Sequence, residues 1–356
     1  MRKKAIVFGV VWAIGFASWQ MHQNQEQWFS LPYNPNDDLA TQVLEISNIK
    51  SSFGNVFVEA EVKSRNQDGF RYLAEPVQFD EEICQRVFWG KPSDPQLTNE
   101  PGYCCGENGE ELWISEGDLL FYRNERAKEI CDMLELAAQW EAGDASHKES
   151  EILALLSEKS REMAFALGVP IPCDVASVKV ISSASLNKIA QDLQFDVVNL
   201  TRTNSNYYQI DLLPHLEGIP ILSPYAFYPE SYVVEEPAEM VLLRFVYEQN
   251  ELIACRMIGC TQPTMVENQT YDFAAESSTK PLQAYFSEII FDGELFIHTI
   301  YPAYCLTKDY TSDRFLFEPV WCYEGEVLYP HERRDSIHVF LSAERKATRN
   351  DSHTTL

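Results

Sequence analysis

Apolar and polar positions alternate along residues 55–63, a period typical of a β-strand with one face in contact with solvent. The apolar side carries Val56, Val58, Ala60 and Val62, and the other side carries Phe57, Glu59, Glu61 and Lys63. Similar alternating or short apolar stretches, bounded by turn residues, lie at 112–115, 118–122, 175–181, 206–222, 239–247, 251–258, 295–306 and 315–323. The pattern therefore predicts a chain that is rich in strands.

Two longer stretches change to a helical period. The first runs from Asn124 to Gly143, with apolar positions at Ala127, Ile130, Leu134, Ala137 and Ala138. The second opens at Ser146 and closes at Gly168, and its apolar face consists of Ile152, Leu155, Leu156, Met163, Ala166 and Leu167. Segments 185–193 and 282–290 predict two shorter helices. Helices that stand in groups between strands favour an α+β fold, with antiparallel sheets packed on helices.

Two strands near the C-terminus are predicted to form a hairpin through the loop from Lys308 to Asp313. In the second strand one face carries Phe315, Phe317, Pro319, Trp321 and Tyr323, while Leu316, Val320 and Cys322 lie on the other. A strand that is apolar on both faces is covered on both sides, which favours core packing. The alternative is an aromatic groove for a protein partner, contacted through Phe317, Trp321 and Tyr323. Pro319 predicts a sheet edge or a bulge.

The centre of that loop sets a register for the hairpin. With Tyr310 at the centre, Cys305 faces Phe315 and Cys322 faces His298. The two cysteines then lie too far apart for a disulfide, which tolerates Cα atoms up to about 7 Å apart. We expect each to be a buried thiol or to reach a more distant strand, where Cys255 and Cys260 are the available partners.

The first 20 residues have the layout of a signal peptide. Arg2, Lys3 and Lys4 precede an uncharged run from Ala5 to Trp19. This run is shorter than the roughly 20 residues of a spanning helix, which favours cleavage, although an uncleaved anchor is the alternative. We expect residues 1–20 to be a signal peptide or membrane anchor. The bulk of the chain is then extracytoplasmic, either secreted or tethered to the cell membrane by residues 5–19.

The rest of the chain is expected to divide into four parts. Residues 21–40 are a polar linker, rich in Gln, Asn and Asp, and residues 41–143 form a β-rich region that ends in a helix. Residues 144–345 form an α+β domain of alternating helices and hairpins, and residues 346–356 form a flexible tail. The pattern after residue 144 is self-contained, so we expect that domain to fold without the first 120 or so residues.

Charge limits the choice of partner. Acidic residues outnumber basic residues 54 to 28 in a chain of 356, which gives a formal net charge of -26. Such a field repels phosphate backbones and anionic lipids, which excludes nucleic acid as an expected partner. Contact with a membrane is expected only through the N-terminal segment, if that segment stays uncleaved. A protein partner is expected to be basic or to dock through apolar contacts.

Cysteines are numerous for a chain of this kind. There are nine, namely Cys84, Cys104, Cys105, Cys131, Cys173, Cys255, Cys260, Cys305 and Cys322. An odd number leaves at least one thiol without an intramolecular partner. A bond between adjacent Cys104 and Cys105 would be strained, so a disulfide from Cys84 to one of these two is the better candidate. No C-x-x-C pair occurs, and neither a zinc ribbon nor a thioredoxin-like site is predicted.

Four landmarks, in this order, give the chain a family resemblance. They are the basic and apolar start, "REMAFALGVP", "YYQIDLLPHLEGIPI", and the closing segment from Ile297 to Gly325. The order resembles extracytoplasmic regulatory proteins of Gram-positive bacteria that are built from PepSY-like repeats, of the YycH/YycI type. In that family a strand leads into a G-[IVL]-P-[IV] turn, matched by Gly218–Ile221, and the final hairpin ends in a Pro-Val-Trp strand, matched by Pro319–Trp321.

The resemblance covers roughly residues 145–325. It implies an α+β fold that accommodates two PepSY-like or YycI-like repeats, no enzymatic activity, and contact with a protein partner such as a membrane sensor protein. The nine cysteines and the irregular segment 90–111 depart from the family's pattern.

No motif in the chain predicts catalytic, cofactor-binding or metal-binding residues. "HERRD" at 331–335 lacks the second histidine of a zinc-protease motif, and His298 is more typical of a structural residue in a strand. Two functions remain. The first is an exported, non-enzymatic binding or regulatory module that acts through protein contacts at the cell surface. The second is a secreted hydrolase whose acid and base residues converge only in the fold. A deep pocket that holds two carboxylates or a histidine–carboxylate pair would favour the second function.

Overall fold

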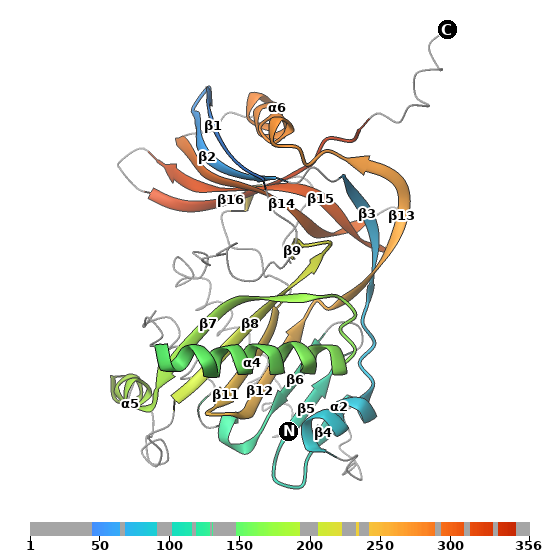
Figure 1. The fold of residues 1–356 in the computed structure, drawn as a ribbon, viewed down its shortest axis with the longest axis vertical. Coiled ribbons are helices and arrows are strands. Elements are labelled where there is room, and N and C mark those ends of the chain that lie inside the picture. The colour runs from blue at the N-terminus through green and yellow to red at the C-terminus, as the bar shows by residue number, and fades with distance from the viewer. Residues whose placement is uncertain are drawn as a thin grey trace, which may run out of the picture.

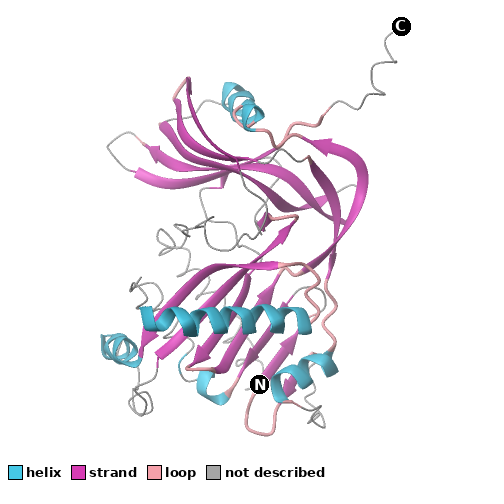
Figure 2. Cartoon of the chain, viewed as in Figure 1, coloured by secondary structure: helices cyan, strands magenta, loops and turns pink. Residues whose placement is uncertain are grey.

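The described strands form one connected sheet of 16 strands, which Figure 1 shows as an upper and a lower part joined through β9 (Ile219–Leu222), with a few helices beside them. These parts are called the upper sheet and the lower sheet below. The computed structural model describes residues 45–64, 68–90, 102–115, 119–128, 130, 147–192, 206–222, 233–234, 242–288, 293–309, 314–329 and 334–346. Strands dominate these ranges, and most neighbouring strands are antiparallel (Figure 2). The predicted α+β class is confirmed.

The lower sheet in Figure 1 is antiparallel throughout and has the order β7-β8-β11-β12-β6-β5-β4. Its strands are β4 (Tyr103–Cys105), β5 (Glu111–Ile114), β6 (Leu119–Arg123), β7 (Cys173–Ser182), β8 (Asn206–Leu216), β11 (Leu242–Glu248) and β12 (Glu251–Ile258). β11 and β12 form a hairpin, and Gln249 at its turn has a positive φ of 56°. Helices α2 (Glu81–Trp89), α4 (His147–Ala166) and α5 (Ser183–Asp192) lie beside this sheet.

Helix α4 confirms the predicted long helix, but its buried face is narrower than predicted. Leu156, Ser160 and Ala164 are buried, and the Ser160 and Tyr247 hydroxyls lie 2.9 Å apart across the contact with β11. Leu155 is 60% exposed and Ala166 is exposed, although both were expected on the apolar face. A flat sheet touches one stripe of a helix, so apolar residues one position away from that stripe face solvent.

The segment from 206 to 222 forms a hairpin of two strands. β8 continues through Pro214, which pairs with Cys173, and β9 (Ile219–Leu222) returns alongside it. The turn consists of Glu217 and Gly218, whose φ angles are 51° and 75°. Two successive residues with positive φ are typical of the tight turn that matches the twist of two antiparallel strands.

The upper sheet is mixed and gathers strands from both ends of the chain. It contains β1 (Glu45–Phe53), β2 (Val56–Ser64), β3 (Gly69–Pro76), β10 (Val233–Val234), β13 (Thr261–Tyr271), β14 (Glu294–Asp309), β15 (Arg314–Leu328) and β16 (Arg334–Ser342). β14 pairs in parallel with β2 and β9, while β15 pairs antiparallel with β14, β3 and β16. The 3-10 helix η3 (Ala275–Ser277) and helix α6 (Lys280–Glu288) lie on its outer face.

The pairing of these strands does not follow the expected division at residue 144. β2 and β3 belong to the region 41–143, yet they pair with β14, β15 and β13 in the upper sheet. β6 belongs to the same region and pairs with β12 in the lower sheet. Both sheets therefore need strands from both parts of the chain. Long-range strand pairing is not visible in a local pattern, so the pattern did not predict these pairings across residue 144.

The terminal hairpin has a different register from the predicted one. Tyr301 faces Cys322 and Cys305 faces Glu318. β14 extends to Asp309 and β15 begins at Arg314, so the connection is shorter and its centre lies later than Tyr310. A bulge next to His298 shifts the pairing again. Cys305 and Cys322 are buried free thiols, as expected.

Pro319 lies neither at a sheet edge nor in a bulge. β15 pairs with β3 through Phe315–Phe317 and with β16 from Val320 onward, and Pro319 falls between these two pairings while it faces Tyr304 of β14. A residue that lacks an N–H is tolerated here because neither β3 nor β16 pairs with this position.

Candidate functional site

The aromatic side chains expected to contact a partner are core residues. Phe317, Trp321 and Tyr323 are all 0% exposed. Tyr323 donates a hydrogen bond of 2.6 Å to the carbonyl of Ser278, and Trp321 packs edge-on against Phe273 at 5.6 Å between ring centroids. The core packing that the pattern favours is therefore confirmed, and the alternative, a partner surface, is wrong for these residues. Phe273 and Ser278 belong to a segment that covers this face of the upper sheet, and the aromatic side chains pack beneath that segment.

The three disulfide candidates are free thiols in the structure. Cys104 does lie close to the helix that carries Cys84, as the prediction requires. Its Sγ contacts Glu81 and Gln85, and both residues belong to α2, as Cys84 does. Burial, together with Asp80 and Glu81, raises the pKa of Cys84 to about 12. Cys105 Sγ instead lies 3.2 Å from the hydroxyl of Tyr103. The expected disulfide is not formed.

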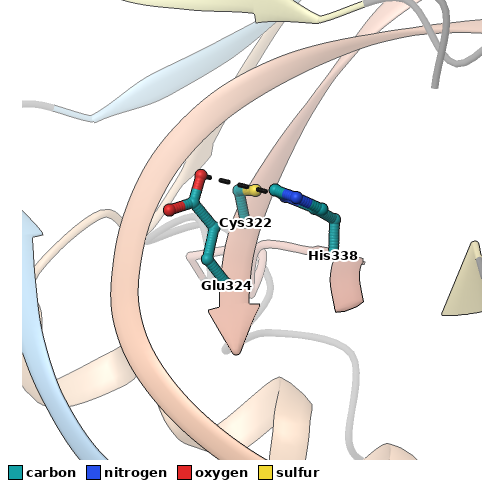
Figure 3. Close-up of side chains that lie close together, drawn as sticks. All are labelled: Cys322, Glu324 and His338. Carbon is teal, nitrogen blue, oxygen red and sulfur yellow. Dashed lines mark ion pairs between the residues drawn. The ribbon is translucent and has the colours of Figure 1, made fainter. Parts of the chain in front are cut away.

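A thiol, a carboxylate and an imidazole converge on one face of the upper sheet, from Cys322, Glu324 and His338 (Figure 3). Cys322 and Glu324 are two positions apart on β15, so their side chains leave the same face. His338 lies on β16 directly opposite Glu324. One ligand atom from each residue lies within 4.8 Å of the other two. These three residues are called the triad below.

Tyr301 completes the group from β14. It is the cross-strand partner of Cys322, and its hydroxyl donates a hydrogen bond of 2.8 Å to Glu324 Oε1. The same oxygen lies 3.8 Å from His338 Nδ1. Three adjacent strands thus supply four polar side chains. Because β15 pairs with β14 on one side and with β16 on the other, the backbone position of each of these residues is fixed.

The triad lies at the edge of an apolar cluster that is formed by residues of both sheets. Cys322 belongs to an apolar cluster with Val320 and Phe340 of the upper sheet and Leu213 and Leu222 of β8 and β9. Along the strands the side chains become more accessible, since Cys322 is 0% exposed while the His338 and Glu324 side chains are 16% and 35% exposed. The group is therefore buried at its thiol end and open at its carboxylate end.

Burial sets the protonation of these groups. It raises the pKa of the Cys322 thiol well above its usual range, and the nearby Glu324 carboxylate adds to this rise. Burial lowers the pKa of His338, against the opposing effect of Glu324. Burial likewise raises the pKa of Tyr301, with further contributions from Cys322 and Glu324. At neutral pH the thiol, phenol and imidazole are all uncharged.

This arrangement does not favour nucleophilic catalysis. A catalytic cysteine reacts as its thiolate and lies in an electropositive, accessible environment. Cys322 has the opposite surroundings, with a neutral imidazole and a carboxylate beside it. Its neighbours on β15 are paired with both β14 and β16. Backbone N–H groups engaged in a sheet do not form the oxyanion hole that acyl transfer requires.

The same atoms suit the binding of a ligand. Thiol, imidazole and carboxylate are the three side-chain groups that bind Zn²⁺ in proteins, and Tyr301 supplies the hydrogen bond that typically orients such a ligand. Among the residues that the structure describes, these three form the one group of His, Cys, Asp and Glu ligand atoms gathered this closely.

Sequence analysis missed all four residues. The spacing Cys322-x-Glu324 indicates two side chains on one face of a strand, but His338 lies beyond the next turn, and only the register of β15 against β16 joins it to them. The histidines that were considered lie elsewhere. His298 is exposed at the bulge of β14, and His331 lies outside the described residues.

Among the helices in the part of the chain that the structure describes, none combines the length and the apolarity that crossing a bilayer requires.

The chain was compared with family models, with curated proteins and with solved structures. No family model matches it, and no curated protein matches it. Among solved structures it is similar to an uncharacterized protein from Eubacterium rectale, with a TM-score of 0.47 and 11% sequence identity. That similarity covers 85% of this chain and 94% of the other.

Proposed function

We propose that this protein is an exported, non-enzymatic binding module, and that the triad of Cys322, Glu324 and His338 is its binding centre. The carrying observation is the convergence of three different ligand-type side chains from paired strands, within 4.8 Å of one another. Their rigid setting favours the holding of a ligand. Their uncharged thiol and paired backbone disfavour covalent chemistry.

Export is the part of this proposal that rests on the sequence. The basic start, Arg2 to Lys4, followed by the apolar run from Ala5 to Trp19, supports a signal peptide or an anchor at residues 1–20. The resemblance to PepSY-like and YycH/YycI-type regulators supports repeats of that type and a protein partner, such as a membrane sensor protein. The net charge of -26 favours a partner with a basic surface.

A secreted hydrolase is the second candidate, and the contact between His338 and Glu324 is the observation that favours it. A histidine oriented by a carboxylate is the usual base beside a nucleophilic thiol. In that mechanism His338 would accept the proton of Cys322 before the thiolate attacked a carbonyl carbon. The raised pKa of the Cys322 thiol opposes this step.

Alkylation of the native protein separates these candidates. Cys305 is a matched control, because it belongs to the same apolar cluster as Cys322 and both are 0% exposed. With iodoacetamide at neutral pH, followed by peptide mapping, we expect Cys322 to react no faster than Cys305. A rate at Cys322 at least tenfold higher, and lost in His338→Ala, would show a thiol activated by histidine and would favour the hydrolase over the binding module.

A fusion reporter tests export independently. A reporter enzyme that is active only outside the cytoplasm, placed after Leu356, should be active in a bacterial host. Deletion of residues 2–19 should abolish that activity while the fusion protein still accumulates. A stable full-length fusion without activity would contradict export and leave the binding centre unaffected.

A further inference from the structure

We infer that the ligand of the triad is a divalent transition metal of the zinc class, bound by Cys322, Glu324 and His338 and oriented by Tyr301. This inference rests on the proposed binding function and names its ligand.

The dimensions of the triad are close to those of a zinc site. If the three ligand atoms stood at the corners of a triangle with 4.8 Å edges, the largest that the structure allows, the centre would lie about 2.8 Å from each atom. Zinc lies about 2.0–2.3 Å from nitrogen, oxygen and sulfur ligands. The 3.8 Å between Glu324 Oε1 and His338 Nδ1 is already near the separation of two ligands in a tetrahedron. A shift of less than about 1 Å per side chain closes the site.

The chemistry of the three ligands selects the metal. Ca²⁺ and Mg²⁺ are bound by oxygen atoms, and a thiol is a poor substitute for them. Thiolate with imidazole suits Zn²⁺ and its neighbours in the first transition row, and a carboxylate is the common third ligand. Cys322 is 0% exposed, so the metal–sulfur bond would be shielded from solvent. The thiol gives up its proton to solvent as this bond forms, so metal binding releases a proton.

Tyr301 acts as a positioning residue rather than as a ligand. Its hydroxyl donates to Glu324 Oε1, so the rotation of that carboxylate is restrained. Loss of such an orienting hydrogen bond typically weakens metal binding by about 10–100-fold. Tyr301→Phe removes only the hydroxyl and keeps the ring that packs against the apolar cluster.

Metal binding would join β15 to β16. Glu324 and His338 are cross-strand partners, so a metal held by both adds a link beside the ladder hydrogen bonds of this pair. A ligand that binds only the folded state raises the unfolding temperature in proportion to the logarithm of its concentration. The inference therefore predicts a metal-dependent rise in thermal stability.

The test uses the full chain purified without a histidine tag, stripped with a chelator and titrated with Co²⁺ and then with Zn²⁺. We expect one metal per chain, a cobalt–thiolate charge-transfer band that Zn²⁺ displaces, and a rise of several degrees in unfolding temperature. Cys322→Ser should abolish the band, and Glu324→Gln and His338→Gln should each weaken binding at least tenfold. Tyr301→Phe should keep the band with about tenfold weaker binding.

Cys305→Ser is the matched control, because it makes the same change at a thiol that is equally buried in the same cluster. It should bind Co²⁺ as the parent does. Absence of stoichiometric metal, or a thiolate band that survives Cys322→Ser, would overturn the inference. Equal loss of the thiolate band in Cys322→Ser and Cys305→Ser would also overturn the inference. If no metal binds and Cys322 is not alkylated faster than Cys305, the metal inference fails but the proposed binding module stands. If Cys322 is alkylated rapidly and this depends on His338, the proposed binding module and the metal inference both fail.

Discussion

At the scale of single residues, Asp211 is a carboxylate buried in the lower sheet. It is 6% exposed and lies on β8. Arg244 donates to both of its oxygens, at 2.8 and 3.2 Å, and Gln209 and Ser177 donate at 2.9 Å each. A buried charge with this many donors is well compensated, but removal of one partner leaves the other uncompensated.

Burial acts to raise the pKa of Asp211, but the Arg244 guanidinium and the hydrogen bonds outweigh it and hold that pKa below its usual range. The stability that the ionised form contributes is therefore fully present above the pKa of Asp in the unfolded chain, about 3.9. It is lost as the pH falls through the lower, folded-state pKa. Acid unfolding should thus depend in part on this one carboxylate.

Asp211→Asn should reduce the free energy of unfolding by about 3–5 kcal/mol at pH 7, because Arg244 keeps its charge without a counter-ion. Urea unfolding between pH 7 and pH 3 measures both the loss and its decline toward acid pH. Glu59→Gln is the control, since its pair with Lys50 is 79% and 78% exposed and should leave stability unchanged within error. Equal effects of the two substitutions would contradict this account of Asp211.

At the scale of elements, helix α4 offers a matched pair of leucines. Leu156 is 0% exposed and Leu155, its neighbour in sequence, is 60% exposed. Both are leucines at adjacent positions of the same helix, so their helix propensities are equal. They differ in whether the sheet covers the side chain.

Leu156→Ala should cost about 2–5 kcal/mol in the free energy of unfolding, because it removes buried methyl groups and leaves a cavity. Leu155→Ala should change it by no more than about 0.5 kcal/mol. Urea unfolding of the two variants, side by side, measures the difference. Similar losses for both would mean that α4 packs through a wider face than the structure has.

Helix α2 shows what the sequence pattern overlooked at this scale. Asp80 caps its first turn by accepting a hydrogen bond from the amide of Ile83, and Gly90 ends it with a positive φ of 73°. Glu81 and Glu82 lie in its first turn and are exposed. A helix of nine residues spans too few turns for a clear period, whereas the caps at both ends were present in the sequence.

At the scale of the whole molecule, strands far apart in the chain are neighbours in both sheets. The first strands, β2 and β3, pair with β14 and β15 near the C-terminus. Removal of β1–β6 would leave one edge of β12 and parts of β14 and β15 without partners. Exposed edges of this length promote aggregation rather than an independent fold.

A fragment that begins at residue 144 should therefore not unfold cooperatively, contrary to the self-contained domain that its pattern favours. Circular dichroism during heating, with the full chain as the control, checks this. A sharp transition in the fragment would show that 144–345 is a domain after all. The strands from 45 to 123 would then be an addition to it.

The sequence by itself determined the strand-rich α+β class, the terminal hairpin and the long helix α4, because local period and turn residues decide these features. It also predicted that β15 is covered on both faces, and it gave a buried thiol as one of two alternatives for Cys305 and Cys322. Only the tertiary structure decided how β14 and β15 were registered and which distant strands shared a sheet. Cys322, Glu324, His338 and Tyr301 come together through cross-strand pairing. A shift of one residue in that pairing would turn the side chains to opposite faces, and no local pattern fixes it.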